Sequence, residues 1–364
     1  MQERQKKIFT LGGAAIALAI LPLIIQPFGD GWVRILDAAL LYVLLALGLN
    51  IVVGYAGLLD LGYVAFYACG AYLFALLASP HLTNNFPALA AAFPDGLHTS
   101  LWLVIPLAAL LAGVLGVLLG APTLKLRGDY LAIVTLGFGE IIRELLTNLN
   151  KPVNLTNGAQ GLSSIDSARI LGVDLNRSKE ILGFDVSGVT QYYYLFIVLV
   201  LISVFISYRL ERSRIGRAWM AIREDEIAAK AMGINTRNMK LLAFGMGATF
   251  GGVSGVMFAS FQRFVSPESF ALNESVMIVA MVVLGGMGHI PGVVLGALLL
   301  AMLPETLRYV AGPLQEISGG RLDASILRQL LISLAMIGIM LWRPRGLWPA
   351  PEHGRAGAPK GGQA

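Results

Sequence analysis

Three charged residues within one apolar run could do chemistry inside a membrane. Glu140, Arg143 and Glu144 lie in residues 129–149, at spacings that place them on one helix face. Glu140 lies 11 residues after Asp129, about 16 Å along a helix axis, which is near the middle of a bilayer. A lone charge there costs about 2.5–3.5 kcal/mol on insertion scales, so we predict a Glu140–Arg143 pair that faces the bundle. Such a pair either ties helices together or belongs to a transport or proton-relay pathway.

The chain lacks the residue patterns of the common catalytic and metal sites. No Lys follows a Gly, so the phosphate-binding loop of ATPases is absent from the sequence. The four His residues are scattered, without the HExxH spacing of a zinc enzyme. Cys69 is the single cysteine, which excludes a disulfide framework and a zinc ribbon. We therefore predict no catalytic residue, no metal site and no cofactor bound by this chain.

The composition indicates a membrane protein with many spans. Of 364 residues, 56% are hydrophobic and 13% are charged, and the mean hydropathy is +0.71. These values exclude a soluble enzyme and a disordered chain. The lack of alternation also disfavours a β-barrel, so we predict an all-α bundle of about ten transmembrane helices. The apolar runs are residues 8–28, 35–54, 58–79, 101–121, 129–149, 191–209, 240–261, 273–289, 290–310 and 325–342.

The distribution of Lys and Arg predicts which loops lie inside the cell. If the N-terminus is cytoplasmic, 17 of the 27 basic residues fall in inside segments and 8 in outside segments, as the positive-inside rule requires. Ten crossings then place both termini in the cytoplasm, with five helices on each side of residues 150–190, an arrangement that suits two inverted halves. No small-x-small site follows the first apolar run, so we expect a retained helix and not a cleaved signal peptide.

This topology divides the chain into regions. Residues 1–348 form the transmembrane domain, with residues 150–190 as a periplasmic loop and residues 210–239 as a cytoplasmic segment. Residues 349–364 are rich in Pro, Gly and Ala and are predicted to be a disordered cytoplasmic tail.

Glycine interrupts the apolar pattern at two places on the predicted inner side. Residues 50–63 contain Asn50, Tyr55, Gly57, Asp60 and Gly62, and residues 284–292 contain four glycines. Neither turn carries Lys or Arg, unlike most inner loops of this chain. Broken backbone at membrane depth must be buried in protein or line a water-filled cavity. These residues are either pathway candidates or part of tight turns just below the lipid headgroups.

The cytoplasmic segment contains an amphipathic pattern. Trp219, Ile222, Glu226, Ala229 and Met232–Gly233 fall near one helical face, and Gly233 is a natural C-cap. We therefore predict a short helix that docks on a cytoplasmic partner. The alternative is a helix lying on the headgroups, which the acidic run 224–226 disfavours.

Together these segments resemble the permease family of branched-chain amino-acid ABC importers, and specifically its LivM-type subunits. The resemblance spans roughly residues 35–345. It is carried by NIVVGYAGLLDLGYVAFYACGAY (50–72), LKLRGDYLAIVTLGFGEIIRELL (124–146), LTNGAQGL (155–162), ERSRIGRAWMAIREDEIAAKAMGIN (211–235) and VVLGGMGHIPGVVLGA (282–297).

The resemblance implies specific partners. They are a second permease of the LivH type, two ABC ATPase subunits that bind the ATP, and a periplasmic binding protein received by residues 150–190. The pattern at 226–233 is similar to the coupling helix of importer permeases, which fits a groove on the ATPase. The residues implied in this contact are Arg217, Glu224, Asp225, Glu226, Ala228, Ala229 and Gly233.

The resemblance also extends the set of pathway candidates. They are Asn50, Tyr55, Gly57, Asp60, Gly62, Glu140, Gly158 and Gly161. An acid at the position of Asp60 departs from the family, where this position is more often small and polar, and it leaves the substrate class open.

We therefore expect a multi-pass permease subunit in the bacterial inner membrane that carries branched-chain or related hydrophobic amino acids. It would contact lipid and no nucleic acid. One alternative is an ABC permease for urea or short amides. Another is an ion-coupled secondary transporter that uses Glu140, Arg143 and Asp60. A purely structural scaffold explains the bundle but neither the docking helix nor the broken turns.

Overall fold

Six helical segments of the computed structural model are long and apolar enough to cross a membrane. The structure describes residues 29–94, 96–123, 128–170, 173–181, 184–317 and 324–343, with the short stretches 18, 21–26, 126 and 346–348. The candidate spans are Asp30–Tyr55, Leu101–Thr123, Gly188–Glu211, Thr236–Gln262, Pro267–Gly285 and Ile290–Leu307. They confirm a multi-pass helical membrane protein, whereas ten crossings and the positions of the termini remain predictions. The predicted first span (8–28) lies mostly outside the described residues, and the tail (349–364) lies wholly outside them.

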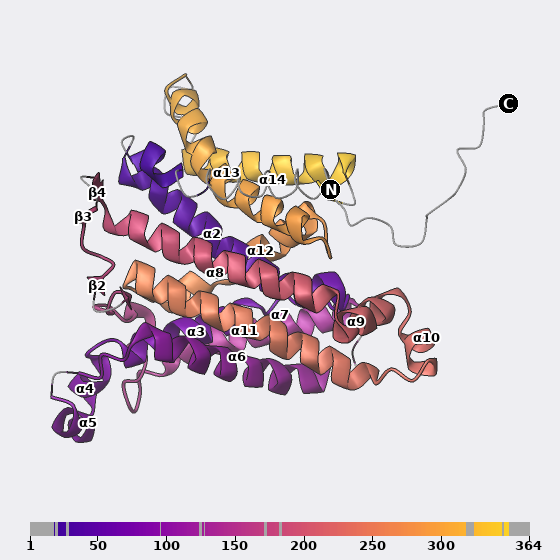
Figure 1. Cartoon of the computed structure of the whole chain (residues 1–364), viewed down its shortest axis with the longest axis horizontal. Coiled ribbons are helices and arrows are strands. Elements are labelled where there is room, and N and C mark those ends of the chain that lie inside the picture. Colours follow the sequence, from indigo (N-terminus) through magenta and orange to yellow (C-terminus); the bar gives the residue numbers. More distant parts are fainter. Residues whose placement is uncertain are drawn as a thin grey trace, which may run out of the picture.

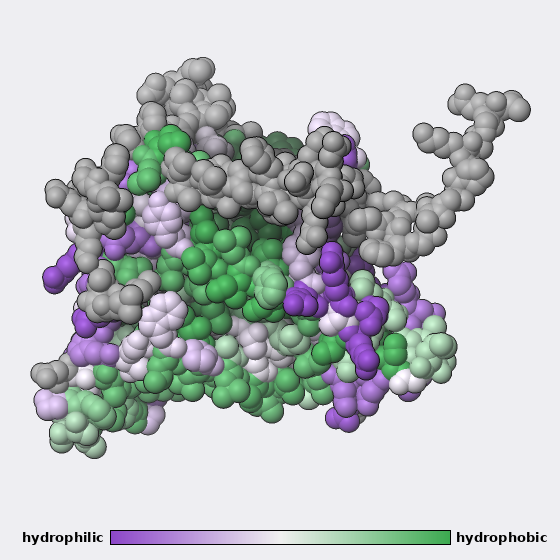
Figure 2. Space-filling view, viewed as in Figure 1, coloured by the Kyte–Doolittle hydropathy of each residue, from purple (hydrophilic) through white to green (hydrophobic). Residues whose placement is uncertain are grey.

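The spans belong to a bundle of long helices with roughly parallel or antiparallel axes (Figure 1). They comprise α2 (Asp30–Asn50) with the π-helix η2 (Ile51–Tyr55), α6 (Leu101–Thr123), α8 (Gly188–Glu211), α11 (Thr236–Gln262), α12 (Leu272–Gly285) and α13 (Ile290–Ile317). Three more helices complete the bundle, α3 (Val64–Leu77), α7 (Asp129–Asn148) and α14 (Ala324–Trp342). Figure 2 shows an apolar surface across the middle of the bundle, with hydrophilic residues gathered at its two ends. This pattern is expected of a protein surrounded by lipid tails.

Short elements lie at the two ends of the bundle (Figure 1). One end carries α9 (Arg214–Glu224) and α10 (Glu226–Ala231). The opposite end carries α4 (His81–Asn85), α5 (Pro87–Ala92) and two antiparallel hairpins, β1 (Arg169–Ile170) with β2 (Val173–Asp174) and β3 (Lys179–Ile181) with β4 (Phe184–Val186). Two 3₁₀ turns, η3 (Gly158–Gln160) and η4 (Pro267–Phe270), lie beside the hairpin end. Residues 80–100 therefore share one end with residues 150–190, the predicted periplasmic loop, and the predicted docking segment lies at the other end.

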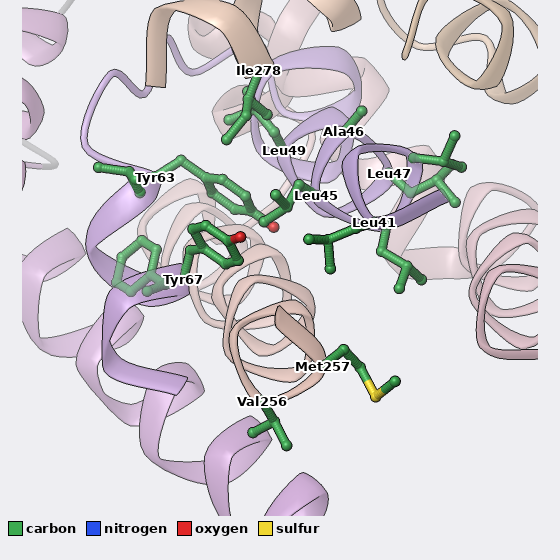
Figure 3. Packing of buried hydrophobic residues seen from close by; sticks show 14 of the residues in the cluster. Leu41, Leu45, Ala46, Leu47, Leu49, Tyr63, Tyr67, Val256, Met257 and Ile278 are labelled. Atoms are coloured by element: carbon green, nitrogen blue, oxygen red, sulfur yellow. The ribbon is translucent and has the colours of Figure 1, made fainter. Parts of the chain in front are cut away.

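The core forms where α11 packs against α6, α3 and α2. Small residues make these contacts close: a Cβ at Gly70 of α3 would lie 2.0 Å from the carbonyl oxygen of Gly252 in α11. One turn away on α11, a Cβ at Gly116 of α6 would lie 2.7 Å from the Cβ of Ala248. Direct backbone contact of this kind drives helix association in lipid. Figure 3 shows larger side chains of the same core, among them Leu41, Leu45, Tyr63, Tyr67, Val256, Met257 and Ile278.

One sequence prediction about secondary structure needs correction. Residues 58–79 do not form one helix, because α3 begins at Val64 and the preceding residues are irregular. Gly57 has a φ of +68°, which interrupts the helical backbone, and Asp60 accepts a hydrogen bond from the backbone N of Gly62 at 2.9 Å. The loop 150–190 contains the two short hairpins, and the bundle itself is all helical.

Candidate functional site

The predicted docking segment folds as two helices, which we call the docking unit (α9 and α10). Ser213 caps α9, because its side chain accepts a hydrogen bond from the backbone N of Gly216 at 3.1 Å. Asp225 is extended, with φ −154° and ψ 111°, and it ends α9. Its carboxylate then caps α10 by accepting hydrogen bonds from the backbone N of Ile227 (2.8 Å) and Ala228 (3.0 Å). The prediction of one continuous amphipathic helix is therefore wrong, because Asp225 caps a new helix.

The end of α10 follows the sequence prediction. Gly233 has a φ of +85°, and its backbone N donates to the carbonyl of Lys230 at 3.1 Å. Glycine adopts this conformation without strain, which confirms its assignment as the C-cap. Ala229 is buried, whereas Ile227 and Met232 are 70% and 83% exposed. The shared face predicted for the segment thus ends at Ala229, and two apolar side chains project from the docking unit.

Two buried contacts fix the docking unit to the start of α11. The indole N of Trp219, which is fully buried, donates to the carbonyl of Met239 at 2.6 Å. Lys240 Nζ forms an ion pair with Glu226 Oε1 at 2.7 Å, and only 6% of the Lys240 side chain is exposed. Both contacts involve consecutive residues of α11, so the two short helices and α11 are held as one unit.

Arg223 connects the docking unit to the first glycine-broken turn. Its Nη1 donates to the carbonyl of Gly54 in the π-helix η2. A Cβ at Gly57 would lie 2.8 Å from Cγ of Arg223, so the arginine stem packs directly on this backbone. The hydrogen bond is charge-assisted and spans 169 residues of sequence. A displacement of α9 therefore acts directly on the end of the α2 span.

The two glycine-broken turns pack against each other, and burial in protein was one of the alternatives that the sequence left open. Asn50 Oδ1 accepts a hydrogen bond from the backbone N of Gly288 at 2.8 Å. A Cβ at Gly54 would lie 2.6 Å from the same N of Gly288. Asn50 and Gly54 are buried, and a Cβ at Gly288 would lie 2.8 Å from Nη1 of Arg223. Arg223 thus touches both turns.

The pathway candidates of residues 50–62 fall into two groups. Asn50, Tyr55 and Gly57 belong to the turn beside the docking unit, and the buried Tyr55 hydroxyl has no hydrogen-bond partner within the described part of the chain. Asp60 and Gly62 instead lie against α7. A Cβ at Gly62 would lie 2.0 Å from the carbonyl oxygen of Thr135. Asp60 is 1% exposed, and its Oδ2 has no hydrogen-bond partner among the residues that the structure describes.

Glu140 and Arg143 form the predicted ion pair, but they do not face the bundle of this chain. Arg143 Nη2 lies 2.6 Å from Glu140 Oε1, and 48% of the Glu140 side chain and 28% of the Arg143 side chain are exposed. Glu144 is 63% exposed and lies 3.9 Å from the same guanidinium. The prediction of a bundle-facing pair is therefore wrong for this chain. The buried face of α7 carries Thr135 and Gly139 instead, Arg143 lies at the edge of that face, and Glu140 and Glu144 are exposed.

Gly158 and Gly161 lie at the hairpin end, away from the docking unit. Both are buried, and a Cβ at Gly161 would lie 2.4 Å from the carbonyl oxygen of Val265. Leu162 and Val265 form a short antiparallel bridge there, with N–O distances of 2.8 and 2.9 Å. The pathway candidates thus extend from one end of the bundle to the other and do not meet in one cavity of the described chain.

Sequence reasoning missed the roles of Arg223 and Lys240. Both appeared only as basic residues of the inner loops, and their partners are distant in sequence, so no local spacing marks them. Arg217, Glu224, Asp225 and Ala228 are exposed on the docking unit, as residues that contact another subunit must be. Arg217 also donates to the carbonyl of Arg212 at 2.9 Å, near the end of α8.

These features define a multi-pass helical membrane protein with a folded docking unit connected to an interrupted span. The chain belongs to the family described as branched-chain amino acid transport system, permease component, which it matches over residues 31–341.

Similar proteins include transport permeases of two kinds. The chain is 40% identical to the high-affinity branched-chain amino acid transport system permease protein LivM of Escherichia coli, over 99% of this chain and 80% of that protein. It is 28% identical to the probable branched-chain amino acid transport permease protein LivM of Methanocaldococcus jannaschii, over 85% and 90% of the two chains. It is 26% identical to the permease protein LivH of Salmonella typhimurium, over 85% and 92%. No solved structure matches the chain.

Proposed function

We propose that this chain is one of two permease subunits of an ATP-driven importer for branched-chain amino acids in the bacterial inner membrane. The observation that carries this proposal is the docking unit, which Arg223 connects to the interrupted span of a LivM-like chain. The other subunits would be a LivH-type permease, two ABC ATPases that bind the ATP, and a periplasmic binding protein. The absence of a phosphate-binding loop from the sequence agrees with ATP hydrolysis on separate chains.

In this proposal the docking unit receives the motion of the ATPase. Ile227 and Met232 are exposed apolar side chains at the end of the bundle that carries α9 and α10, and they suit a groove on a cytoplasmic partner. Because Glu226 and Trp219 hold the unit to α11, and Arg223 holds it to η2, a push on α10 reaches two long helices. Opening and closing of the pathway follows as those helices shift.

The exposed face of α7 supports a second permease beside this one. Its charged residues lie near the middle of a 20-residue helix, where exposure to lipid is costly. Glu140 and Arg143 must therefore face another protein or water. We assign this face to the water-filled pathway between the two permeases. Substrate released by the binding protein crosses along it, and affinity resides in the binding protein.

The α7 face makes a prediction about water access. With Cys69 replaced by alanine, Glu140→Cys is expected to react with a charged methanethiosulfonate at least tenfold faster than Leu110→Cys in the assembled transporter. Leu110 is 65% exposed on α6 but lies on an apolar surface that meets lipid. Equal, slow labelling of both cysteines would show that this face of α7 does not line a water-filled pathway.

The hairpin end suits reception of the binding protein. His98 Nδ1 lies 2.6 Å from Asp166 Oδ2, and Trp102 Nε1 donates to the carbonyl of Arg169 at 3.2 Å, so the two predicted outer loops are joined. Burial would raise the pKa of Asp174, but hydrogen bonds from Ser167 and Asn176 outweigh it and lower that pKa. This end is therefore an ordered surface that carries charge at neutral pH.

The transport proposal is tested by reconstitution. Proteoliposomes that contain this chain, its second permease, the ATPases and the binding protein are expected to take up leucine only with ATP, and a proton gradient without ATP should drive none. Urea and acetamide as competitors test the alternative substrates. ATP-independent uptake by this chain alone would favour the ion-coupled transporter and overturn the proposal.

A further inference from the structure

A cavity of about 250 Å³ lies between the docking unit and the membrane-spanning part of the chain, beside the contacts of Arg223. Its walls come from the loop after η2, the start of α7, the junction of α9 and α10, and Lys240 of α11. In the proposed function the docking unit moves relative to the membrane-spanning helices, and this cavity lies between them. Six of the lining residues matter here: Leu126, Asp129, Leu131, Arg223, Glu226 and Lys240.

Among the described residues that line this cavity, two are acids and two are bases. Glu226 and Lys240 neutralise each other at 2.7 Å. Arg223 donates Nη1 to Gly54, and Asp129 forms no hydrogen bond or ion pair with the described residues. A ligand with a carboxylate and an ammonium group would pair with Arg223 and Asp129 respectively, and it would leave no charge uncompensated.

The remaining wall is aliphatic. Leu131 and Ile222 are 3% and 5% exposed, and Leu58 and Leu126 lie beside them in the lining. The volume is below the roughly 300–1,000 Å³ of pockets for drug-sized ligands, so a smaller molecule fits. A zwitterion with a short branched hydrocarbon side chain matches both the charges and the apolar wall.

We propose that this cavity binds a free aliphatic α-amino acid from the cytoplasm and that its occupancy slows import. The proposal rests on the transport function proposed above, because it identifies the ligand with the imported product. The bound amino acid bridges Asp129 of α7 and Arg223 of α9. It therefore stabilises the arrangement of walls to which it binds, and the transport cycle must separate or reshape those walls.

Binding is measured first, on the full chain in lipid nanodiscs, by equilibrium dialysis with radiolabelled leucine. We expect saturable binding that unlabelled isoleucine displaces and glycine displaces poorly. Asp129→Asn, which keeps the side-chain shape, and Leu126→Trp, which fills the cavity, are each expected to raise the Kd at least tenfold. Asp30→Asn is the matched control, an exposed acid in the first turn of α2 outside the cavity, and it should leave the Kd unchanged. Absence of binding, or equal Kd values for the wild type and Asp129→Asn, would overturn the proposal.

Inhibition is measured next, in proteoliposomes of the complete transporter preloaded with leucine. Internal leucine is expected to slow the initial ATP-driven uptake at least fivefold in the wild type and less than twofold in Asp129→Asn. Uninhibited wild-type uptake would contradict the regulatory role and leave the transport function intact. If the proposed transport function is wrong, proteoliposomes without internal leucine will show no ATP-driven uptake. Equilibrium dialysis still decides in that case whether the cavity binds leucine.

Discussion

Replacement of Arg223 by alanine is expected to reduce ATP-driven leucine uptake at least tenfold while the subunits stay assembled. The change removes a charge-assisted hydrogen bond to the Gly54 carbonyl and the packing of the arginine stem on Gly57. Hydrogen bonds to charged groups contribute about 1.5–3 kcal/mol, and about 1.4 kcal/mol corresponds to a factor of ten. If Arg223 transmits the motion of the docking unit, ATP hydrolysis continues while uptake falls, so uptake per ATP is the quantity to measure.

Two further variants make this result specific. Arg214→Ala removes an exposed charge at the start of the same helix and should leave uptake per ATP unchanged. Arg223→Lys keeps the charge but loses the planar guanidinium, and it should give an intermediate value. Wild-type uptake per ATP in Arg223→Ala would show that force does not pass through this residue.

The second large effect is expected from the ion pair between Glu226 and Lys240. Glu226→Gln leaves the Lys240 ammonium charged and almost completely buried without a counter-ion. Removing one member of a buried pair destabilises by about 3–5 kcal/mol. We expect the docking unit to detach from α11, which lowers the melting temperature of the complex and exposes residues 224–240 to limited proteolysis.

Comparing the stabilities of the two single variants and the double variant tests the ion pair more sharply than Glu226→Gln alone. Lys240→Met should be milder than Glu226→Gln, because Glu226 is 29% exposed and water can solvate its charge. The double variant Glu226→Gln/Lys240→Met should recover most of the lost stability, since no unpaired buried charge remains. A double variant as unstable as Glu226→Gln would mean that the glutamate acts through contacts other than the lysine.

Features that depend on composition or local conformation were predictable from the sequence. The lack of charge predicts membrane spans, and six are found. Gly233 was assigned as a helix cap because glycine tolerates a positive φ, and its φ is +85°. The two glycine-broken turns stand out in the sequence because they lack basic residues, and they contact each other through Asn50 and Gly288.

Features that depend on tertiary contacts were not predictable from the sequence. Asp225 looks like one of three acids in an amphipathic helix, and its capping role requires a chain reversal that periodicity does not reveal. Glu140 and Arg143 were expected to face this chain's own bundle, because hydropathy cannot distinguish a neighbouring helix from a neighbouring subunit. The bond from Arg223 to Gly54 joins residues that no local pattern relates.

The central claim, that this chain is a permease driven by separate ATPases, is tested most directly by the composition of the purified assembly. The chain is tagged at its genomic locus, solubilised in mild detergent, and its partners are quantified by mass spectrometry. We expect one copy of this chain, one similar permease and two chains with a phosphate-binding loop. A solitary chain that remains active in proteoliposomes under a proton gradient would contradict the claim.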